Sequence, residues 1–65
     1  MRETVAAFIN RAVADTMLIR VEANDMLPII GTKEEIINKA DGLYFMGFEL
    51  DGFNSVTIKA TYHAC

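Results

Sequence analysis

The 65-residue sequence lacks most of the residues that small proteins use to reinforce a fold or to bind a metal. A single cysteine excludes an internal disulfide, and with a single histidine the chain cannot supply four Cys and His ligands for structural zinc. Its glycines are dispersed, so it has no glycine-rich loop of the phosphate-binding kind. We therefore expect neither a metal nor a cofactor.

Long apolar runs and basic clusters are missing as well. No apolar stretch reaches the roughly 18 residues that a membrane-spanning helix needs. The N-terminus, with Arg2, Glu3 and an early Asn10, does not resemble a signal peptide. Its six Lys and Arg residues are scattered and are outnumbered by nine Asp and Glu, which argues against direct binding of nucleic acid. We expect a cytoplasmic protein that does not contact a membrane.

What the chain does have is apolar content, 52% of its residues, at a length that allows one domain over residues 1–65. A chain of this mass buries only about 60% of its extended surface, so the gain from burial and the entropy of ordering nearly cancel. Without a disulfide or a metal, very good packing or association must supply the stability. The composition therefore favours binding, either to a second copy or to another protein.

Hydrophobic periodicity predicts a helix and then a strand in the first part of the chain. Residues 4–14 carry apolar side chains at helical spacing. Residues 16–23 alternate instead, which predicts a strand with one buried face. A helix that continues through Met17 is the alternative, because Met, Leu, Arg and Glu tolerate helix. We expect residues 26–31, which include Pro28, to form an apolar connector.

The second half predicts a short helix and a hairpin. Thr32 and Glu35 match a capping box, in which each side chain binds the other residue's amide, and Gly42 is a natural stop. Residues 43–50 and 56–63 are rich in strand-forming residues and flank a hairpin loop. The inner face of the hairpin is expected to hold Tyr44, Met46, Phe48, Leu50, Val56, Ile58, Ala60 and Tyr62. The outer face is expected to hold Leu43, Phe45, Gly47, Glu49, Thr57, Lys59, Thr61 and His63.

The resulting order is α-β-α-β-β. It predicts an α+β domain with a three-stranded, mainly antiparallel sheet and two helices packed on one face.

Catalytic residues are hard to find in this sequence. His63 and Cys65 lie two apart at the C-terminus, and a Cys/His pair is a possible nucleophile and base. Chain ends fray, however, and nothing nearby suggests an oxyanion site. The adjacent carboxylates of Glu34 and Glu35 do not face each other on a helix, and their capping role accounts for them. We therefore expect no catalytic residues and no enzyme.

Two features suggest a binding surface instead. Acidic side chains are concentrated after the first helix, and they suit a basic site on a partner protein, such as a nucleic-acid-binding site. Leu43 and Phe45 would lie on the uncovered sheet face, with Phe53 at the hairpin tip, where apolar groups favour contact. The alternatives are a solvated acidic face, and coverage of the apolar residues by the first helix or by a bulge at Gly47. The candidate partner-binding residues are Glu22, Asp25, Glu34, Glu35, Leu43, Phe45, Glu49 and Phe53.

These observations predict a small acidic protein–protein interaction module, an inhibitor or regulator that blocks a partner protein's surface. In size and composition the chain is similar to the small antagonist proteins that phages and mobile elements make, which block a host enzyme or a defence complex. The alternative is a homo-oligomer, for example a homodimer, with a structural or regulatory role and no catalysis.

Overall fold

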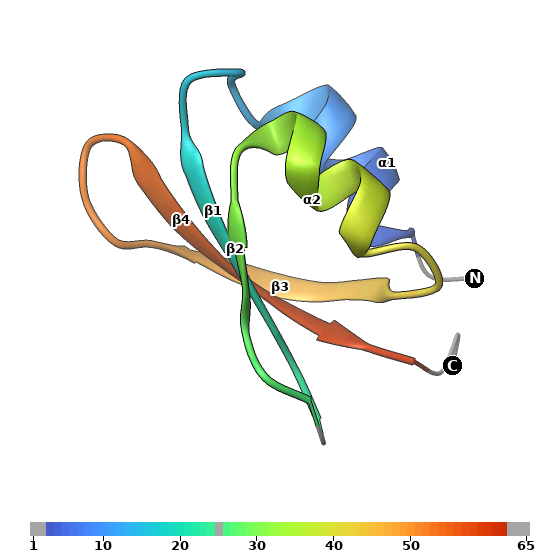
Figure 1. Cartoon of the computed structure of the whole chain (residues 1–65). Helices are drawn as coiled ribbons and strands as arrows, with labels where there is room; N and C mark the ends of the chain where they lie inside the picture. Colours follow the sequence, from blue (N-terminus) through green and yellow to red (C-terminus); the bar gives the residue numbers. More distant parts are fainter. Residues whose placement is uncertain (1–2, 25, 63–65) are drawn as a thin grey trace.

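The computed structural model describes residues 3–24 and 26–62, which form a four-stranded sheet with two helices on one face (Figure 1). The sheet order is β2-β1-β4-β3. The central pair, β1 and β4, is parallel, and the two outer pairs are antiparallel. The α+β class is therefore confirmed. The elements are α1 (Val5–Ala12), β1 (Leu18–Ala23), β2 (Ile29–Gly31), α2 (Lys33–Lys39), β3 (Tyr44–Leu50) and β4 (Ser55–Thr61).

The prediction of a three-stranded sheet is wrong, because the expected connector contains strand β2. Ile29 pairs with Val21, and Gly31 pairs with Ile19, in an antiparallel register. Ile29 packs against the core, and Pro28 lies just before the strand, where its missing amide removes no ladder hydrogen bond. The strand prediction for the preceding segment is confirmed by β1, so the alternative of a continuing helix is wrong.

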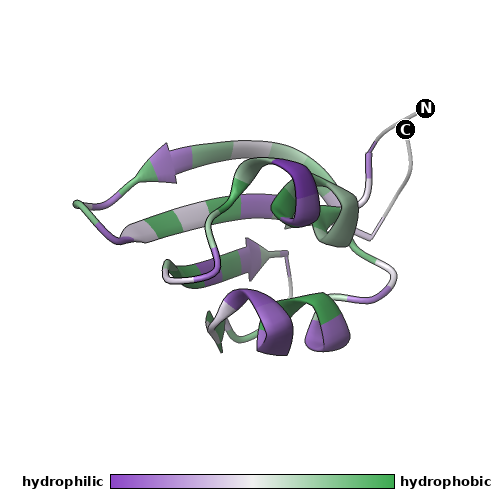
Figure 2. Ribbon diagram, turned by 90° about the horizontal axis from the view of Figure 1, so that it is seen from above, coloured by the Kyte–Doolittle hydropathy of each residue, from purple (hydrophilic) through white to green (hydrophobic). Residues whose placement is uncertain are grey.

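Both predicted helices form and lie over the same face of the sheet (Figure 2). The hydroxyl of Thr4 accepts a hydrogen bond from the Ala7 amide at 3.1 Å and caps α1, which ends at Ala12, two residues earlier than expected. The predicted capping box of α2 is present. The Glu35 carboxylate accepts from the amide and from the hydroxyl of Thr32, each at 3.1 Å, and these bonds lower the pKa of Glu35.

The core lies between the helices and the sheet. Leu43 belongs to it, with only 2% of its surface exposed, although the sequence pattern placed this side chain outside. Leu43 lies just before β3, and its carbonyl accepts a hydrogen bond from the Val5 amide at 3.0 Å, which draws it under the start of α1. The largest fully buried side chains are Ile9, Ile19, Ile36, Ile58, Val5 and Val21.

A bulge in β3 changes which of its side chains face the helices. Phe45 pairs with Ala60 and Gly47 pairs with Lys59, so Met46 is the extra residue. The bulge places Phe45 on the same side as the inward Ala60, which contradicts the expected outward orientation. It also leaves Met46, expected inside, 56% exposed.

Beyond the bulge the expected pattern returns. Phe48 and Leu50 pair with the inward Ile58 and Val56, as predicted for the inner face. Tyr62 was expected inside but follows the end of β4 and is 53% exposed, and its hydroxyl contacts Met26 Sδ at 3.1 Å.

Candidate functional site

An apolar groove lies between the C-terminal half of α1 and the second half of β3. Its volume is about 440 Å³. Phe48 and Leu50 form its open side and remain 55% and 65% exposed, respectively, although they face the helix layer. The groove forms because α1 packs on β3 through Phe8 and Phe45 and leaves Phe48 and Leu50 largely exposed. Its lining residues are Phe8, Arg11, Ala12, Val13, Met17, Phe45, Phe48, Leu50 and Val56.

Three aromatic rings connect the core to this groove. The ring of Phe8 is buried and stacks on that of Phe45, with centroids 4.0 Å apart and planes 17° apart. The ring of Phe48 lies 5.5 Å from that of Phe8 in a tilted arrangement. Because one side of this cluster is buried and the other is exposed, the groove has a fixed apolar floor.

The rim of the groove carries a neutralised positive charge. The guanidinium of Arg11 lies over the Phe8 ring, 5.2 Å from its centroid. The same group donates two hydrogen bonds to the Glu3 carboxylate, Nε to Oε2 and Nη2 to Oε1, both at 2.7 Å. These bonds lower the pKa of Glu3 and raise that of Arg11. The groove therefore presents a neutral apolar surface rather than a cation site.

The outer edge of β3 is covered over its first half only. The Phe45 amide donates to the Glu3 carbonyl at 2.7 Å, and Thr4 forms an isolated antiparallel bridge with Tyr44. The segment before α1 thus occupies the edge up to the bulge. No described segment pairs with the residues beyond it on that side, from Gly47 to Leu50.

The direction of the backbone groups on this open edge follows from the hairpin. The Asp51 amide donates to the Ser55 carbonyl at 3.0 Å, so Asp51 directs its backbone groups toward β4. In an antiparallel ladder this direction alternates along the strand. The amides of Gly47 and Glu49 therefore face β4, whereas those of Phe48 and Leu50 face the open edge. Backbone donors and acceptors with which no described segment pairs thus lie directly beside the exposed apolar side chains.

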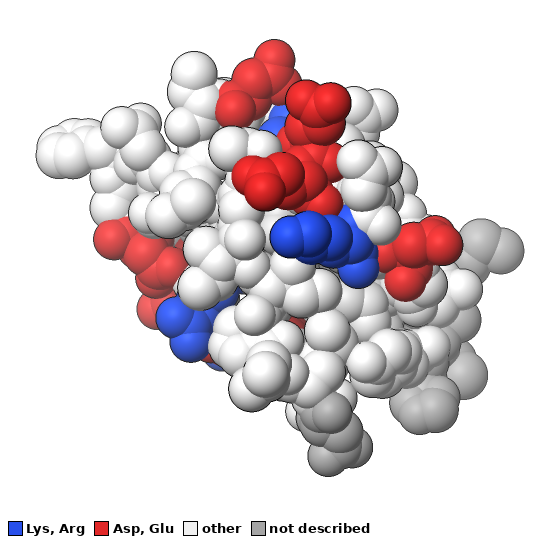
Figure 3. All heavy atoms as spheres, in the orientation of Figure 1, with Lys and Arg blue, Asp and Glu red and all other residues white. Residues whose placement is uncertain are grey.

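The predicted acidic residues do not form one surface. Glu22 lies on the helix-free face of the sheet, where its carboxylate pairs with Lys59 at 2.8 Å and with Arg20 at 3.0 Å. Glu34 and Glu35 belong to α2, on the other face. Figure 3 shows acidic side chains gathered over α2, apart from those at the sheet. Glu49 pairs with the outward Thr57 on the helix-free face. Asp25, His63 and Cys65 lie outside the described residues.

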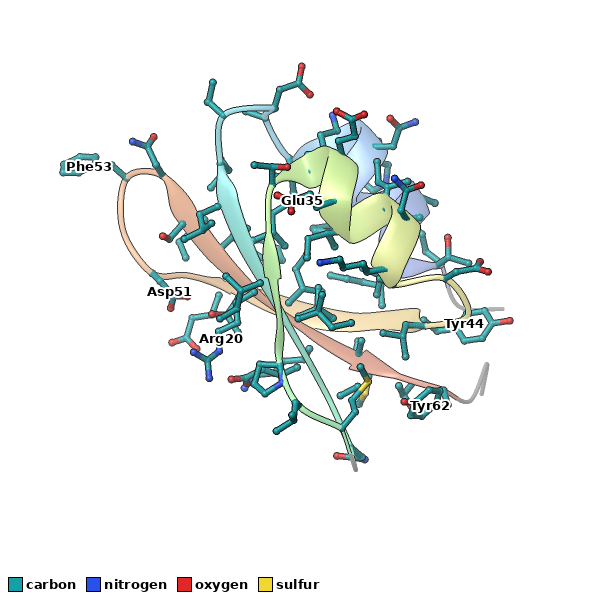
Figure 4. All side chains as sticks on the ribbon, in the orientation of Figure 1. Arg20, Glu35, Tyr44, Asp51, Phe53 and Tyr62 are labelled. Carbon is teal, nitrogen blue, oxygen red and sulfur yellow. The ribbon has the colours of Figure 1, made fainter. Side chains whose placement is uncertain are left out.

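The predicted apolar contact residues have three different environments. Leu43 is buried and Phe45 is half-buried against the core. Phe53 is 102% exposed at the tip of the β3–β4 loop and points away from the rest of the molecule (Figure 4). The sequence pattern missed the groove because it assigned Phe48 and Leu50 to a covered inner face. A glycine inside a strand, Gly47, was the one signal for the bulge.

No family model, no curated protein and no solved structure matches this chain. Within residues 3–24 and 26–62, no group of three or more His, Cys, Asp or Glu side chains is placed to hold a metal ion. In the same part of the chain, no helix has the length and apolar character needed to cross a membrane. The groove and the open edge of β3 are therefore the features on which a functional interpretation rests.

Proposed function

We propose that this chain is a protein-interaction module that inhibits or regulates a partner protein by binding it through the apolar groove and the adjoining open edge of β3. The observation that carries the proposal is the exposure of Phe48 and Leu50, 55% and 65%, beside backbone groups with which no described segment pairs. Exposed apolar patches of this kind mark interaction surfaces.

The two parts of the site support different contributions to binding. An extended segment of a partner that pairs with the open edge would make main-chain hydrogen bonds, as in strand addition. Apolar side chains on that segment would fill the groove, and each buried Å² of apolar surface contributes about 25 cal/mol. Since the Arg11 charge is already paired with Glu3, a neutral apolar segment fits better than an acidic one.

A non-catalytic role is supported by what lines the groove. Among its described lining residues, Arg11 is the one charged side chain, and its guanidinium is held by Glu3. A neutral, open and apolar surface suits contact with another protein better than proton transfer.

The experiment is affinity capture with the tagged protein from a lysate of the cells that encode it, or of their host, followed by titration of the purified partner. Leu50→Glu should weaken binding about tenfold or more, because it places a charge at the centre of the contact. Phe53→Ser is the control, since it removes an even more exposed apolar side chain outside the groove. Circular dichroism would verify that both variants fold.

Two outcomes would contradict the proposal. An equal loss of affinity in both variants, or no loss in either variant, would mean that the partner does not bind in the groove. Binding that disappears as salt is raised and is lost with Glu34→Lys would assign the contact to the acidic surface over α2 and to a basic site on the partner. Binding retained at high salt and lost only with Leu50→Glu would support the groove.

A further inference from the structure

We infer that the open edge of β3 pairs with the same edge of a second copy of this chain, antiparallel and with the two-fold axis at Phe48. This inference rests on the proposed function, because it uses the same edge. It adds that a dimer, rather than a single chain, presents the groove.

The choice of edge follows from how the sheet protects its other edges. Strands that end a sheet are usually shortened, bulged or covered, because their free backbone groups recruit other strands. β2 has only three residues and follows Pro28. The first half of β3 is covered by the segment at Glu3 and Thr4 and ends in a bulge. Within residues 3–24 and 26–62, no segment covers residues 47–50 of β3, and these residues have no such protection.

Charge selects the register. Residues directly opposite each other in an antiparallel pair interact, and like charges there are destabilising. An axis at Glu49 would place the two Glu49 carboxylates opposite each other. An axis at Leu50 would place Glu49 opposite Asp51. An axis at Phe48 avoids both, because it places Glu49 of each copy opposite Gly47 of the other.

Opposite charges on either side of Gly47 also favour this register. Gly47 pairs with Lys59 of β4, so Lys59 would lie one strand further along the same row as Glu49 of the second copy. A Cβ added at Gly47 would meet nothing within 4 Å, so the space above this glycine is open. Glu49 of one copy can therefore extend over Gly47 toward Lys59 of the other, where it would join the existing ion pair of Lys59 with Glu22, and symmetry repeats this contact.

The helix side of the pair is apolar. The Phe48 backbone groups face the open edge, so the two Phe48 residues would exchange two hydrogen bonds at the axis and bring their rings side by side. Both apolar grooves would then face each other across the axis and remain open above the sheet. In this dimer the edge is used by the second copy, so a partner protein would bind the grooves alone, and strand addition by a partner would compete with self-pairing.

The register is tested by disulfide trapping under mild oxidation in a Cys65→Ser background. In the inferred dimer the Phe48 Cα atoms are about 5.5 Å apart, within disulfide range, so Phe48→Cys should give a covalent dimer. The Glu49 Cα atoms would be about 8 Å apart, and Glu49→Cys should stay monomeric on a non-reducing gel. Cross-linking of Glu49→Cys but not of Phe48→Cys would overturn the inferred register.

The edge itself is tested by sedimentation over a concentration series. The full chain should change from monomer to dimer as its concentration rises. Leu50→Pro should abolish the dimer, because it removes an amide that faces the open edge and makes no bond within the sheet. Leu50→Ala keeps that amide and should still dimerise, which controls for the lost side chain.

Each remaining outcome separates this inference from the proposed function. A full chain that stays monomeric at every concentration, and gives no cross-link at Phe48→Cys, would overturn the inference. If that monomer still lost its partner protein with Leu50→Glu, the proposed function would stand. A dimer of the inferred register that binds no other protein would support the inference and overturn the proposed function.

Discussion

The ring of Phe8 stacks on the ring of Phe45, and this contact joins α1 to β3 at the floor of the groove. One turn earlier, the Val5 amide donates to the Leu43 carbonyl at 3.0 Å. The groove is therefore bounded by a part of the molecule that belongs to the hydrophobic core. Its far side is formed by Phe48 and Leu50, whose side chains remain largely exposed to solvent.

Loss of the Phe8 ring should destabilise the fold. Phe8→Ala removes a buried aromatic side chain and leaves a cavity next to Phe45, so we expect the free energy of unfolding to fall by about 3 kcal/mol. Urea denaturation monitored by circular dichroism measures this change. Phe53→Ala is the control and should alter stability by less than about 0.5 kcal/mol, because Phe53 makes no buried contact. Equal effects of the two substitutions would contradict the packing described for α1.

Two glycine substitutions should differ in the sign of their effect. A Cβ at Gly31 would lie 3.1 Å from the Glu35 Cβ and 3.3 Å from its carboxylate, so Gly31→Ala should displace the cap of α2 and lower stability by about 1 kcal/mol. The Cβ of Gly47→Ala meets open space. This substitution should leave the stability of the fold unchanged or raise it by about 0.4 kcal/mol, because it restricts the unfolded chain. Thermal unfolding at low protein concentration compares them. A more damaging Gly47→Ala would mean that the bulge itself requires glycine.

The ion pair on the helix-free face predicts a pH window for stability. The hydrogen bond from Lys59, and then that from Arg20, lowers the pKa of Glu22 below its ordinary 4.5. The contribution of Glu22 is therefore present above that value and is lost as pH falls through the folded pKa. The bond to Glu22 raises the pKa of Lys59 above 10.5, so its contribution is present below that value and is lost as pH rises through the folded pKa. Thermal midpoints should decline at both ends of this window.

Nuclear magnetic resonance titration of the two side chains checks the pair directly, and Glu22→Gln is the matched variant. In this variant Lys59 should titrate closer to 10.5, because its main partner has lost its charge. The change in stability should be small and should diminish with salt, since both side chains are solvent-exposed. An unchanged Lys59 titration in Glu22→Gln would show that the pair does not form in solution.

Helix positions were predictable because local signals and burial agreed. The capping box of Thr32 and Glu35 forms as expected, and the buried positions of α1 follow helical spacing. Strand β1 was also predictable, because the apolar Ile19 and Val21 alternate with the charged Arg20 and Glu22; both apolar residues are fully buried.

Two features of the sheet were not predictable from local patterns: strand β2, and which side chains of β3 face the helices. A three-residue strand next to Pro28 is too short to show an alternation, and only its pairing with β1 defines it. In β3, one extra residue at the bulge moves Phe45 inward and Met46 outward. Continuous alternation from residue 43 therefore assigned Leu43 and Phe45 to the wrong face. The exposed tip position of Phe53 was correct because hairpin loops are exposed wherever the strands lie.

The candidate site was less predictable than the fold. Charge composition indicated an acidic protein, but only the three-dimensional structure separates Glu22 on the sheet from Glu34 and Glu35 on α2. The groove combines α1 with a strand more than thirty residues away in sequence, as in the contact between Phe8 and Phe48. No local pattern encodes such a juxtaposition.

The most direct test of the open edge of β3 as a binding surface is amide hydrogen exchange at Phe48, compared with Glu49 in the same strand. In dilute protein, the Glu49 amide, which faces β4, should exchange slowly, and the Phe48 amide should exchange rapidly. Raising the protein concentration, or adding a partner protein that binds this edge, should slow exchange of the Phe48 amide and leave the exchange rate of the Glu49 amide unchanged. Rapid exchange at Phe48 under every condition would contradict the account, as would full protection of Phe48 in the dilute monomer.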